Sequence, residues 1–199
     1  MPSNITRQQQ KELTKQRILD AAVESLIDLG VARTTTLEVQ KRADVSRGAL
    51  LHHFHTHAEL IAAAVAEIVK QNEAAVLANH QRQANKTDPI QRAITTLSIV
   101  ATEKSFLAEM ELWIVSRTNN DLREALISAE KNAFSDRSRV VDMVFASFKE
   151  HPQYQLVVDT TIEFLRGLAI SSVLRKNPSN TQQLIRQWIE VIKIILTDS

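Results

Sequence analysis

The sequence predicts an all-α protein of about nine helices, with an N-terminal three-helix helix-turn-helix domain followed by a larger helical domain. Three observations predict this fold class. The 199 residues include only three Gly and four Pro and are rich in helix-forming side chains. Apolar residues recur at three- and four-residue intervals along most of the chain. No alternating strand pattern bounded by turn residues is found.

The first predicted helix begins near Thr14 and ends at Gly30. Its apolar positions recur at helical spacing, and glycine is the residue best suited to the end of a helix. Residues 1–8 are polar and carry no recognised cap. They are therefore expected to form a disordered arm.

Two short helices follow, joined by a tight turn. Thr35 and Glu38 match the capping box at the start of the first, and Ser46 suits the N-cap of the second, which runs to Phe54. Leu50 and Phe54, four residues apart, should face inward. This pattern is the helix-turn-helix unit, whose second helix enters a DNA major groove.

The remaining Gly, Pro and Asn residues divide the rest of the chain into helices. A long Ala-rich helix is expected from about Ala58 to Gln83. Asp88-Pro89 is an N-cap followed by proline at the first helical position, so a helix starts there. A further long helix starts at residues 119–121 and runs through Phe148. His151-Pro152 ends it, and residues 177–180 separate the last two helices. We expect a helix-turn-helix domain over residues 1–57 and a second domain over residues 58–199.

Charge and cysteine content narrow the function classes. The net charge is +1, but residues 1–57 hold eight basic against six acidic side chains, which agrees with a nucleic-acid partner for this part. The absence of Cys excludes disulfides, thiolate metal sites and Cys nucleophiles. Without an 18-residue apolar run or an apolar signal core, the protein is expected to be cytoplasmic, with no membrane contact.

The second helix of the unit carries side chains suited to DNA. Arg47 can reach guanine or a phosphate, and Ser46 with the helix amides can bind a phosphate. The small Gly48 and Ala49 allow close approach of the backbone, and His52 lies where the helix would leave the groove. From spacing alone, an ordinary pair of surface helices stays an open alternative.

The segment from about Lys15 to Leu60 resembles the N-terminal domain of the TetR (tetracycline-repressor-like) family. The matching residues are Arg17-Ile18-Leu19-Asp20-Ala21-Ala22, Gly30, Thr34-Thr35, the run Ala43-Asp44-Val45-Ser46-Arg47-Gly48-Ala49-Leu50, His52-His53-Phe54 and Glu59-Leu60. The resemblance implies a homodimeric transcriptional regulator, a repressor that a small-molecule effector releases from a palindromic double-stranded DNA operator. The implied DNA-binding residues are Thr34, Thr35, Ser46, Arg47, Gly48, Ala49, Leu51, His52 and His57.

Three positions depart from the family pattern. Asp44 stands where the turn usually has Gly, and Asp tolerates a left-handed backbone better than most residues. Leu51 replaces a Tyr that touches the phosphate or groove wall, and His57 replaces a Lys at the start of the fourth helix. These changes affect individual contacts and leave the mode of docking unchanged.

The second domain is expected to bind the effector and to dimerise. Large apolar residues and one arginine in helices that enclose the effector in this family form the expected ligand site: Phe106, Met110, Trp113, Arg117, Phe134 and Phe164. Each is also compatible with plain core packing. Because few polar groups accompany them, an apolar or weakly amphipathic effector is expected.

The last two helices are expected to form the dimer interface. Gly167 lies in the middle of a helix, where it is less favourable than Ala by up to about 1 kcal/mol. Close helix approach explains it, either at a subunit interface or at a tight crossing inside one subunit. The last helix is apolar on more than one face. The expected interface residues are Gly167, Ile170, Leu174, Ile185, Trp188 and Ile192.

Two other function classes are compatible with parts of the sequence. His52, His53, His55 and His57 suggest a metal-dependent enzyme, but consecutive residues on a helix point about 100° apart, and no carboxylate completes a site. The sequence contains no Gly-rich phosphate loop, nucleophile elbow or His-Glu-x-x-His pair, so we expect no enzyme, cofactor or metal. A helical dimeric interaction protein without DNA binding is the other alternative.

Overall fold

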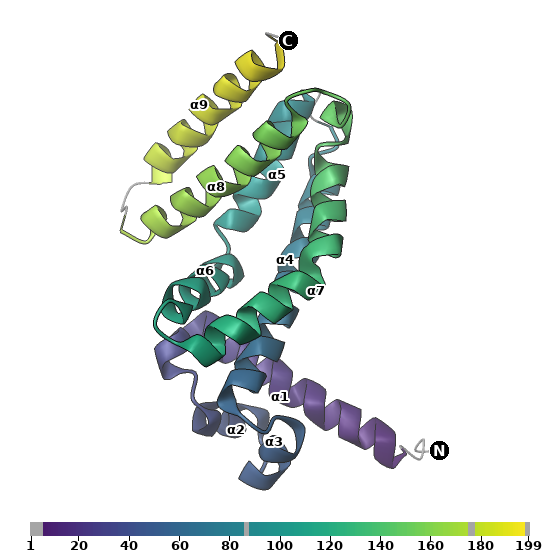
Figure 1. Cartoon of the computed structure of the whole chain (residues 1–199), viewed down its shortest axis with the longest axis vertical. Coiled ribbons are helices and arrows are strands. Elements are labelled where there is room, and N and C mark those ends of the chain that lie inside the picture. The colour runs from purple at the N-terminus through teal and green to yellow at the C-terminus, as the bar shows by residue number, and fades with distance from the viewer. Residues whose placement is uncertain (1–5, 86–87, 175–177, 198–199) are drawn as a thin grey trace. The chain divides into compact units, whose positions relative to one another are not determined.

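The computed structural model describes residues 6–85, 88–174 and 178–197, and this part of the chain is all-α (Figure 1). It contains nine α-helices and two short 3-10 helices and no strand, which confirms the predicted fold class. The elements are α1 (Arg7–Leu29), η1 (Val31–Arg33), α2 (Thr36–Ala43), α3 (Arg47–His53), α4 (His57–Arg82), α5 (Pro89–Ala101), α6 (Lys104–Ser116), α7 (Asn120–Val144), η2 (Ala146–Phe148), α8 (Tyr154–Ser172) and α9 (Pro178–Thr197).

Helix α1 begins about two turns earlier than predicted. Thr6 is its N-cap: its hydroxyl accepts from the Gln9 amide at 3.2 Å, and the Gln9 side chain accepts from the Thr6 amide at 2.8 Å. This reciprocal capping box satisfies two amides at the helix start. Arg7 and Gln8 are therefore helical, which corrects part of the expected disordered arm. Residues 1–5 of that arm lie outside the described residues.

The other helix boundaries follow the predicted signals closely. Gly30 ends α1, with its amide donating to the Leu26 carbonyl at 3.1 Å. The Asp88 carboxylate caps α5, accepting from two backbone amides, and Pro89 is the first helical residue. Helix α7 stops at Val144, short of the predicted Phe148, because the chain tightens into η2.

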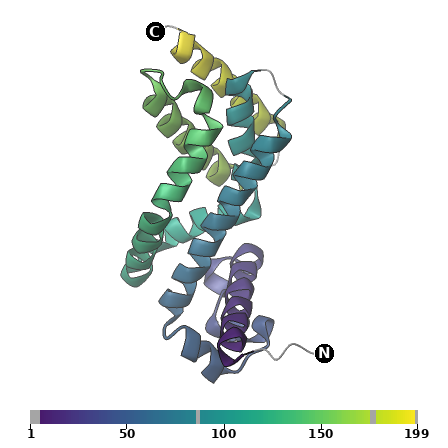
Figure 2. The ribbon, with the colours of Figure 1, turned by 90° about the vertical axis from the view of Figure 1, so that its right-hand side faces the viewer.

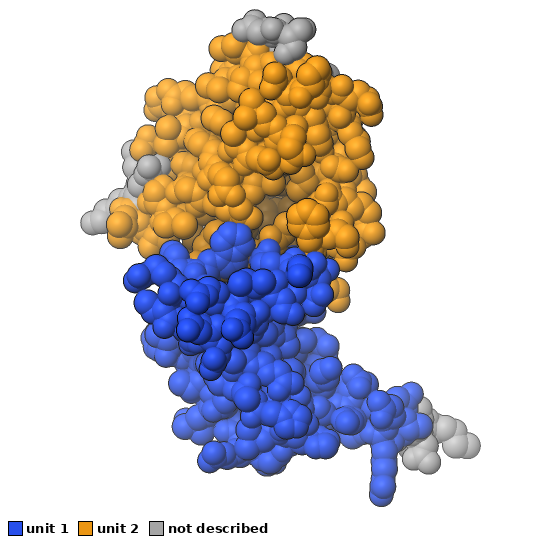
Figure 3. Space-filling model, viewed as in Figure 1, with its two compact units in different colours: residues 1–69, 111–132 blue, residues 70–110, 133–199 orange. Residues whose placement is uncertain are grey.

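The chain forms two compact units (Figure 3). Unit 1 comprises residues 1–69 and 111–132, and unit 2 comprises residues 70–110 and 133–199. Helices α4, α6 and α7 each contribute to both units. The predicted division between residues 57 and 58 separates a DNA-binding domain from an effector-binding domain. It stays a prediction, because the two units are defined by packing and not by function.

Each unit buries apolar side chains from several helices. In unit 1, α1 packs against α2 and α3, with Ile18, Leu26, Val39 and Leu50 among the fully buried residues. In unit 2, α5, α8 and α9 pack against one another (Figures 1 and 2), and Phe145 is buried in this core. No helix in the described ranges is long and apolar enough to cross a membrane.

Candidate nucleic-acid interface

The turn between α2 and α3 has a left-handed residue at its centre. Asp44 has φ 50° and ψ 55°, the conformation that glycine adopts most easily and that Asp tolerates. The Asp44 and Val45 amides donate to the Lys41 and Gln40 carbonyls, so the end of α2 is closed by a Schellman-type pair of bonds. A further bond, from Arg17 Nη2 to the Asp44 carbonyl at 3.1 Å, ties the turn to α1.

Both short helices have the predicted N-caps. The Thr35 hydroxyl accepts from the Glu38 amide, and the Ser46 hydroxyl accepts from the Ala49 amide, each at 3.2 Å. The predicted return bond of the capping box, from the Thr35 amide to the Glu38 carboxylate, is wrong. The Glu38 carboxylate turns toward Arg42 instead, 4.0 Å from its Nη2. Thr35 still defines where α2 starts.

An ion-pair cluster links α2 to α1. Arg42 Nη1 donates to the Asp28 carboxylate at 2.8 Å and lies 3.6 Å from Glu24. The hydrogen bond that Arg42 donates to Asp28 is the main cause of the raised pKa of Arg42, and the charges of Asp28, Glu24 and Glu38 add to it. Because the Glu24 and Asp28 side chains are more than half exposed, these ion pairs add little to stability.

Helix α3 has one buried and one exposed face. Leu50 and the following Phe54 are buried against the same core as Val39, as predicted. The opposite face leaves Arg47 and Gly48 exposed, together with Leu51 and His52. Since the inward residues fix the rotation of the helix, these side chains stay available to a partner.

The predicted contact residues outside α3 divide into two groups. Thr35 is exposed, but Thr34 is only 1% exposed and its hydroxyl donates to the Gly30 carbonyl at 2.8 Å. This corrects the expectation for Thr34, which supports the connection between α1 and α2 from inside. His57 is exposed at the start of α4, and its Nε2 lies 2.8 Å from the Thr34 carbonyl. Because a carbonyl oxygen only accepts, Nε2 of His57 carries the proton in this hydrogen bond.

The connection over residues 30–35 is held from α6 as well as from α4. The Glu111 carboxylate of α6 accepts from the Val31 amide at 3.0 Å. Gly30 adopts φ 77°, and a Cβ at this position would lie 3.0 Å from both Glu111 carboxylate oxygens. The backbone conformation therefore favours glycine here, and a Cβ would also require the Glu111 carboxylate to shift. We call these contacts of Glu111, Gly30, Thr34 and His57 the α1–α2 clasp.

The histidines near α3 do not gather into a metal centre. Among the described residues, no group of three or more His, Asp or Glu side chains is placed to hold a metal ion. The rings of His52 and His53 meet edge to face, with centroids 5.4 Å apart. His55 instead lies 3.5 Å from Glu59.

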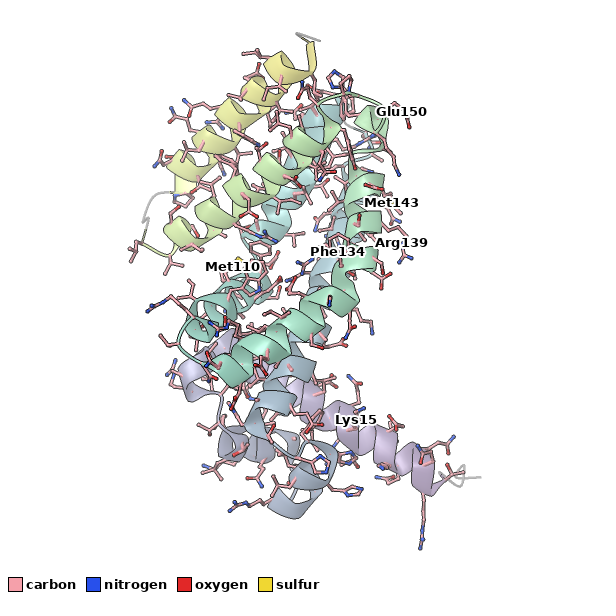
Figure 4. All side chains as sticks on the ribbon, in the orientation of Figure 1. Lys15, Met110, Phe134, Arg139, Met143 and Glu150 are labelled. Atoms are coloured by element: carbon pink, nitrogen blue, oxygen red, sulfur yellow. The ribbon has the colours of Figure 1, made fainter. Side chains whose placement is uncertain are left out.

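The residues expected to bind an effector are divided between the two units. Trp113 and the exposed Arg117 belong to unit 1, and the other four belong to unit 2. Phe106 and Phe164 pack beside the same small core cluster, and Met110 is buried. Phe134 on α7 is 73% exposed (Figure 4), which corrects the expectation that it is enclosed.

Unit 2 contains a buried polar network that the sequence analysis missed. Glu109, only 3% exposed, accepts from Arg137 Nη2 at 3.0 Å and from Asn72 Nδ2 at 2.9 Å. The Ser105 hydroxyl donates to Asn72 Oδ1 at 2.6 Å. Burial raises the pKa of the neighbouring Glu73, an effect that the Arg137 charge opposes. The partners are separated by about thirty residues in sequence, so no local pattern signals them.

The expected dimer residues also divide. Gly167, Ile170 and Leu174 are exposed, and nothing lies within 4 Å of a Cβ placed on Gly167. A tight crossing inside this chain therefore does not explain Gly167. Ile192, however, is 0% exposed and belongs to this chain's own core, which corrects its expected place in an interface.

Trp188 and Ile185 are likewise engaged within the chain. The Trp188 indole donates to the Thr161 hydroxyl at 3.1 Å, and its ring stacks on Phe164 with centroids 4.7 Å apart. Ile185 packs against core residues of unit 2. The exposed large apolar residues of α9 are instead Val191 and Ile194, which lie one position before and two positions after the expected Ile192.

Comparison with known proteins agrees with this geometry. Residues 18–64, which contain the helix-turn-helix unit, match the family described as "Bacterial regulatory proteins, tetR family". An uncharacterized HTH-type transcriptional regulator of Mycobacterium tuberculosis, Rv2912c, is 30% identical over 121 residues, covering 61% of this chain and 62% of the relative. The chain thus spans less than two thirds of that relative. The HTH-type transcriptional regulator CymR of Pseudomonas putida is 22% identical over 96% of this chain and 95% of its own length.

Solved structures share the fold. The multidrug binding protein EbrR, crystallised with proflavin, superimposes with a TM-score of 0.61 at 19% identity, over 88% of this chain and 99% of EbrR. The family match and the left-handed turn between two capped helices make residues 18–64 similar to the tetR family of bacterial regulatory proteins, and the solved structures show that the fold is shared over most of the chain.

The clasp makes Gly30 sensitive to substitution. We expect Gly30→Ala to lower the free energy of unfolding by about 1–3 kcal/mol, because an L side chain is strained at this φ and its Cβ meets the Glu111 carboxylate. Urea denaturation measures the change. Gly48→Ala is the matched control: its Cβ would meet nothing closer than Ser46 Oγ at 3.9 Å. Equal stability of the two variants would contradict the clasp.

Proposed function

We propose that this chain is a homodimeric transcriptional regulator that binds a palindromic operator and is released from it, as a repressor, by a small molecule. The observation that carries the proposal is the outward face of α3. Arg47 and Gly48 are exposed at its capped N-terminus while Leu50 is buried beneath them. This arrangement is what a helix needs to enter the major groove with its first turn.

The residues proposed to contact DNA follow from exposure. Arg47 reaches guanine or a phosphate, Gly48 and Ala49 allow close approach, and the Ser46 and Thr35 regions offer helix amides to phosphates. Leu51 and His52 continue the same exposed face, and His57 stands at its edge. Thr34 is not among the proposed contacts. The protein acts in the cytoplasm by binding and not by catalysis.

The effector is proposed to bind in unit 2. EbrR, whose fold this chain shares, is described as a multidrug binding protein and has been crystallised with proflavin. Unit 2 combines apolar rings, Phe106 and Phe164, with the Glu109–Arg137 network. The combination of apolar rings and a charged network favours a weakly amphipathic effector over a purely apolar one.

Dimerisation is proposed to use the outer faces of α8 and α9. Gly167, Ile170 and Leu174 recur at helical spacing on α8 and at its end, and Leu174 is 88% exposed. Val191 and Ile194 add apolar surface from α9. Exposed apolar side chains on two adjacent helices are favourable where a second copy covers them.

Arg47 is the most direct test of DNA recognition. We expect Arg47→Ala to weaken binding to a DNA fragment from upstream of the protein's own gene by about 1–3 kcal/mol, because a bidentate base or phosphate contact is lost. Arg82→Ala, an exposed arginine at the end of α4, is the control and should bind normally. A mobility shift at several salt concentrations measures both. Binding that ignores salt, or an unaffected Arg47→Ala, would overturn the proposal.

The dimer interface is tested by a charge on its apolar face. We expect Ile170→Glu to convert a dimer into monomers, because the interface would bury an unpaired carboxylate. Light scattering after gel filtration gives the mass. Ile127→Glu, on an exposed apolar position of α7 in unit 1, should remain dimeric. A dimeric Ile170→Glu would place the interface elsewhere.

A further inference from the structure

The early start of α1 adds basic residues to unit 1. Arg7, Lys11 and Lys15 recur every fourth residue on this helix, so they lie on neighbouring positions of one side, and all three are exposed. None of them belongs to the helix-turn-helix unit itself. The added turns therefore extend the positive surface beyond α2 and α3.

Helix α3 packs against α1, and Lys11 and Lys15 of α1 (Figure 4 labels Lys15) lie close enough to His53 of α3 for their charges to act on it. The pKa of His53 is lowered, first by burial and then by the positive charges of His52, Lys11 and Lys15. Glu12, also on α1, opposes this effect. Cationic or protonatable groups from two helices thus share one small region.

Other charged side chains around this region are engaged elsewhere. Arg42 of α2 pairs with Asp28, and Arg17 donates to the Asp44 carbonyl. His55, before α4, lies beside Glu59. Glu12 contributes an opposing negative charge at His53, against the positive charges of two lysines and a second histidine. Such a group is favourable next to an anion and unfavourable alone.

We propose that Lys11, Lys15, His52 and His53 form a phosphate-binding cluster that carries the DNA interface from the end of α3 onto the first turns of α1. This inference rests on the proposed function, and it names the DNA backbone as the ligand of a surface outside the helix-turn-helix unit. A seven-residue helix is about 10 Å long, so the cluster lies about that far along α3 from Arg47. Duplex DNA presents one negative charge per about 1.7 Å of its axis, so phosphates flank any groove that α3 enters.

The cluster couples DNA binding to proton uptake. A phosphate beside an imidazole favours its charged form, so the pKa of His53 is higher in the complex than in the unbound protein, where it lies below its ordinary value. Affinity for DNA therefore rises as the pH falls through the pKa of the complex. It levels off below the pKa of the unbound protein, where both states are protonated.

The lysines are tested with the full chain and a mixed-sequence DNA duplex, because phosphate contacts do not depend on sequence. Fluorescence anisotropy is followed across a salt series. We expect Lys11→Ala/Lys15→Ala to weaken binding at least about tenfold at low salt and to reduce the slope of log K against log salt by about two per subunit. Lys104→Ala, an exposed lysine at the start of α6 in unit 2, should leave the slope unchanged.

The histidines are tested by the same titration between about pH 6 and pH 8. We expect wild-type affinity to increase toward the acidic end and His53→Gln to flatten this dependence. His52→Gln serves as a second variant in the same titration. His52 is exposed, so its substitution should not disturb the fold, whereas His53 is partly buried.

The outcomes separate the two proposals. A duplex that the wild type does not bind at low salt would overturn the proposed function. Normal wild-type binding with an unchanged salt slope in the double lysine variant would overturn the cluster alone. An equal pH dependence of affinity in the wild type and both histidine variants would overturn the coupling of DNA binding to proton uptake.

Discussion

The structure of unit 1 depends on the short connection between α1 and α2. Residues 30–35 reverse the chain, and their geometry decides where α2 starts and hence where α3 lies. Gly30 provides a backbone conformation that other residues avoid, and Glu111 of α6 occupies the space that a side chain would fill. His57 at the start of α4 holds the same connection through the Thr34 carbonyl. Two helices outside the helix-turn-helix unit thus define its starting point.

From this connection onward, local interactions build the surface that we propose reads DNA. Thr35 starts α2, the left-handed Asp44 turns the chain, and Ser46 starts α3. Each step satisfies backbone groups that a helix end would otherwise leave unpaired. Burial of Leu50 and Phe54 then sets the rotation of α3, so that Arg47 points outward. The absence of glycine at position 44 is compatible with this geometry because Asp adopts the required conformation.

Features encoded by neighbouring residues could be predicted, and features made by distant ones could not. The caps at Thr35, Ser46 and Asp88 were predicted because each joins residues two or three apart. The capping box of Thr6 and Gln9 is equally local, and reading it would have placed the start of α1 correctly. Burial of Thr34 and the Glu109–Arg137 pair depend on tertiary contacts. Ile192 was assigned to the outer face of α9 but is buried, whereas Val191 and Ile194 are exposed, because each position turns the side chain by about 100° around a helix.

Mapping the backbone amide chemical shifts of the labelled protein as a DNA duplex is added tests most directly whether α3 enters the groove. The outward face of α3 is the surface that should enter the groove, so the largest changes are expected over residues 46–53, with smaller ones at the start of α1. The buried residues of α5, α8 and α9 should change little. Changes concentrated in α8 and α9, with residues 46–53 unaffected, would contradict the assignment of α3 as the DNA-reading helix.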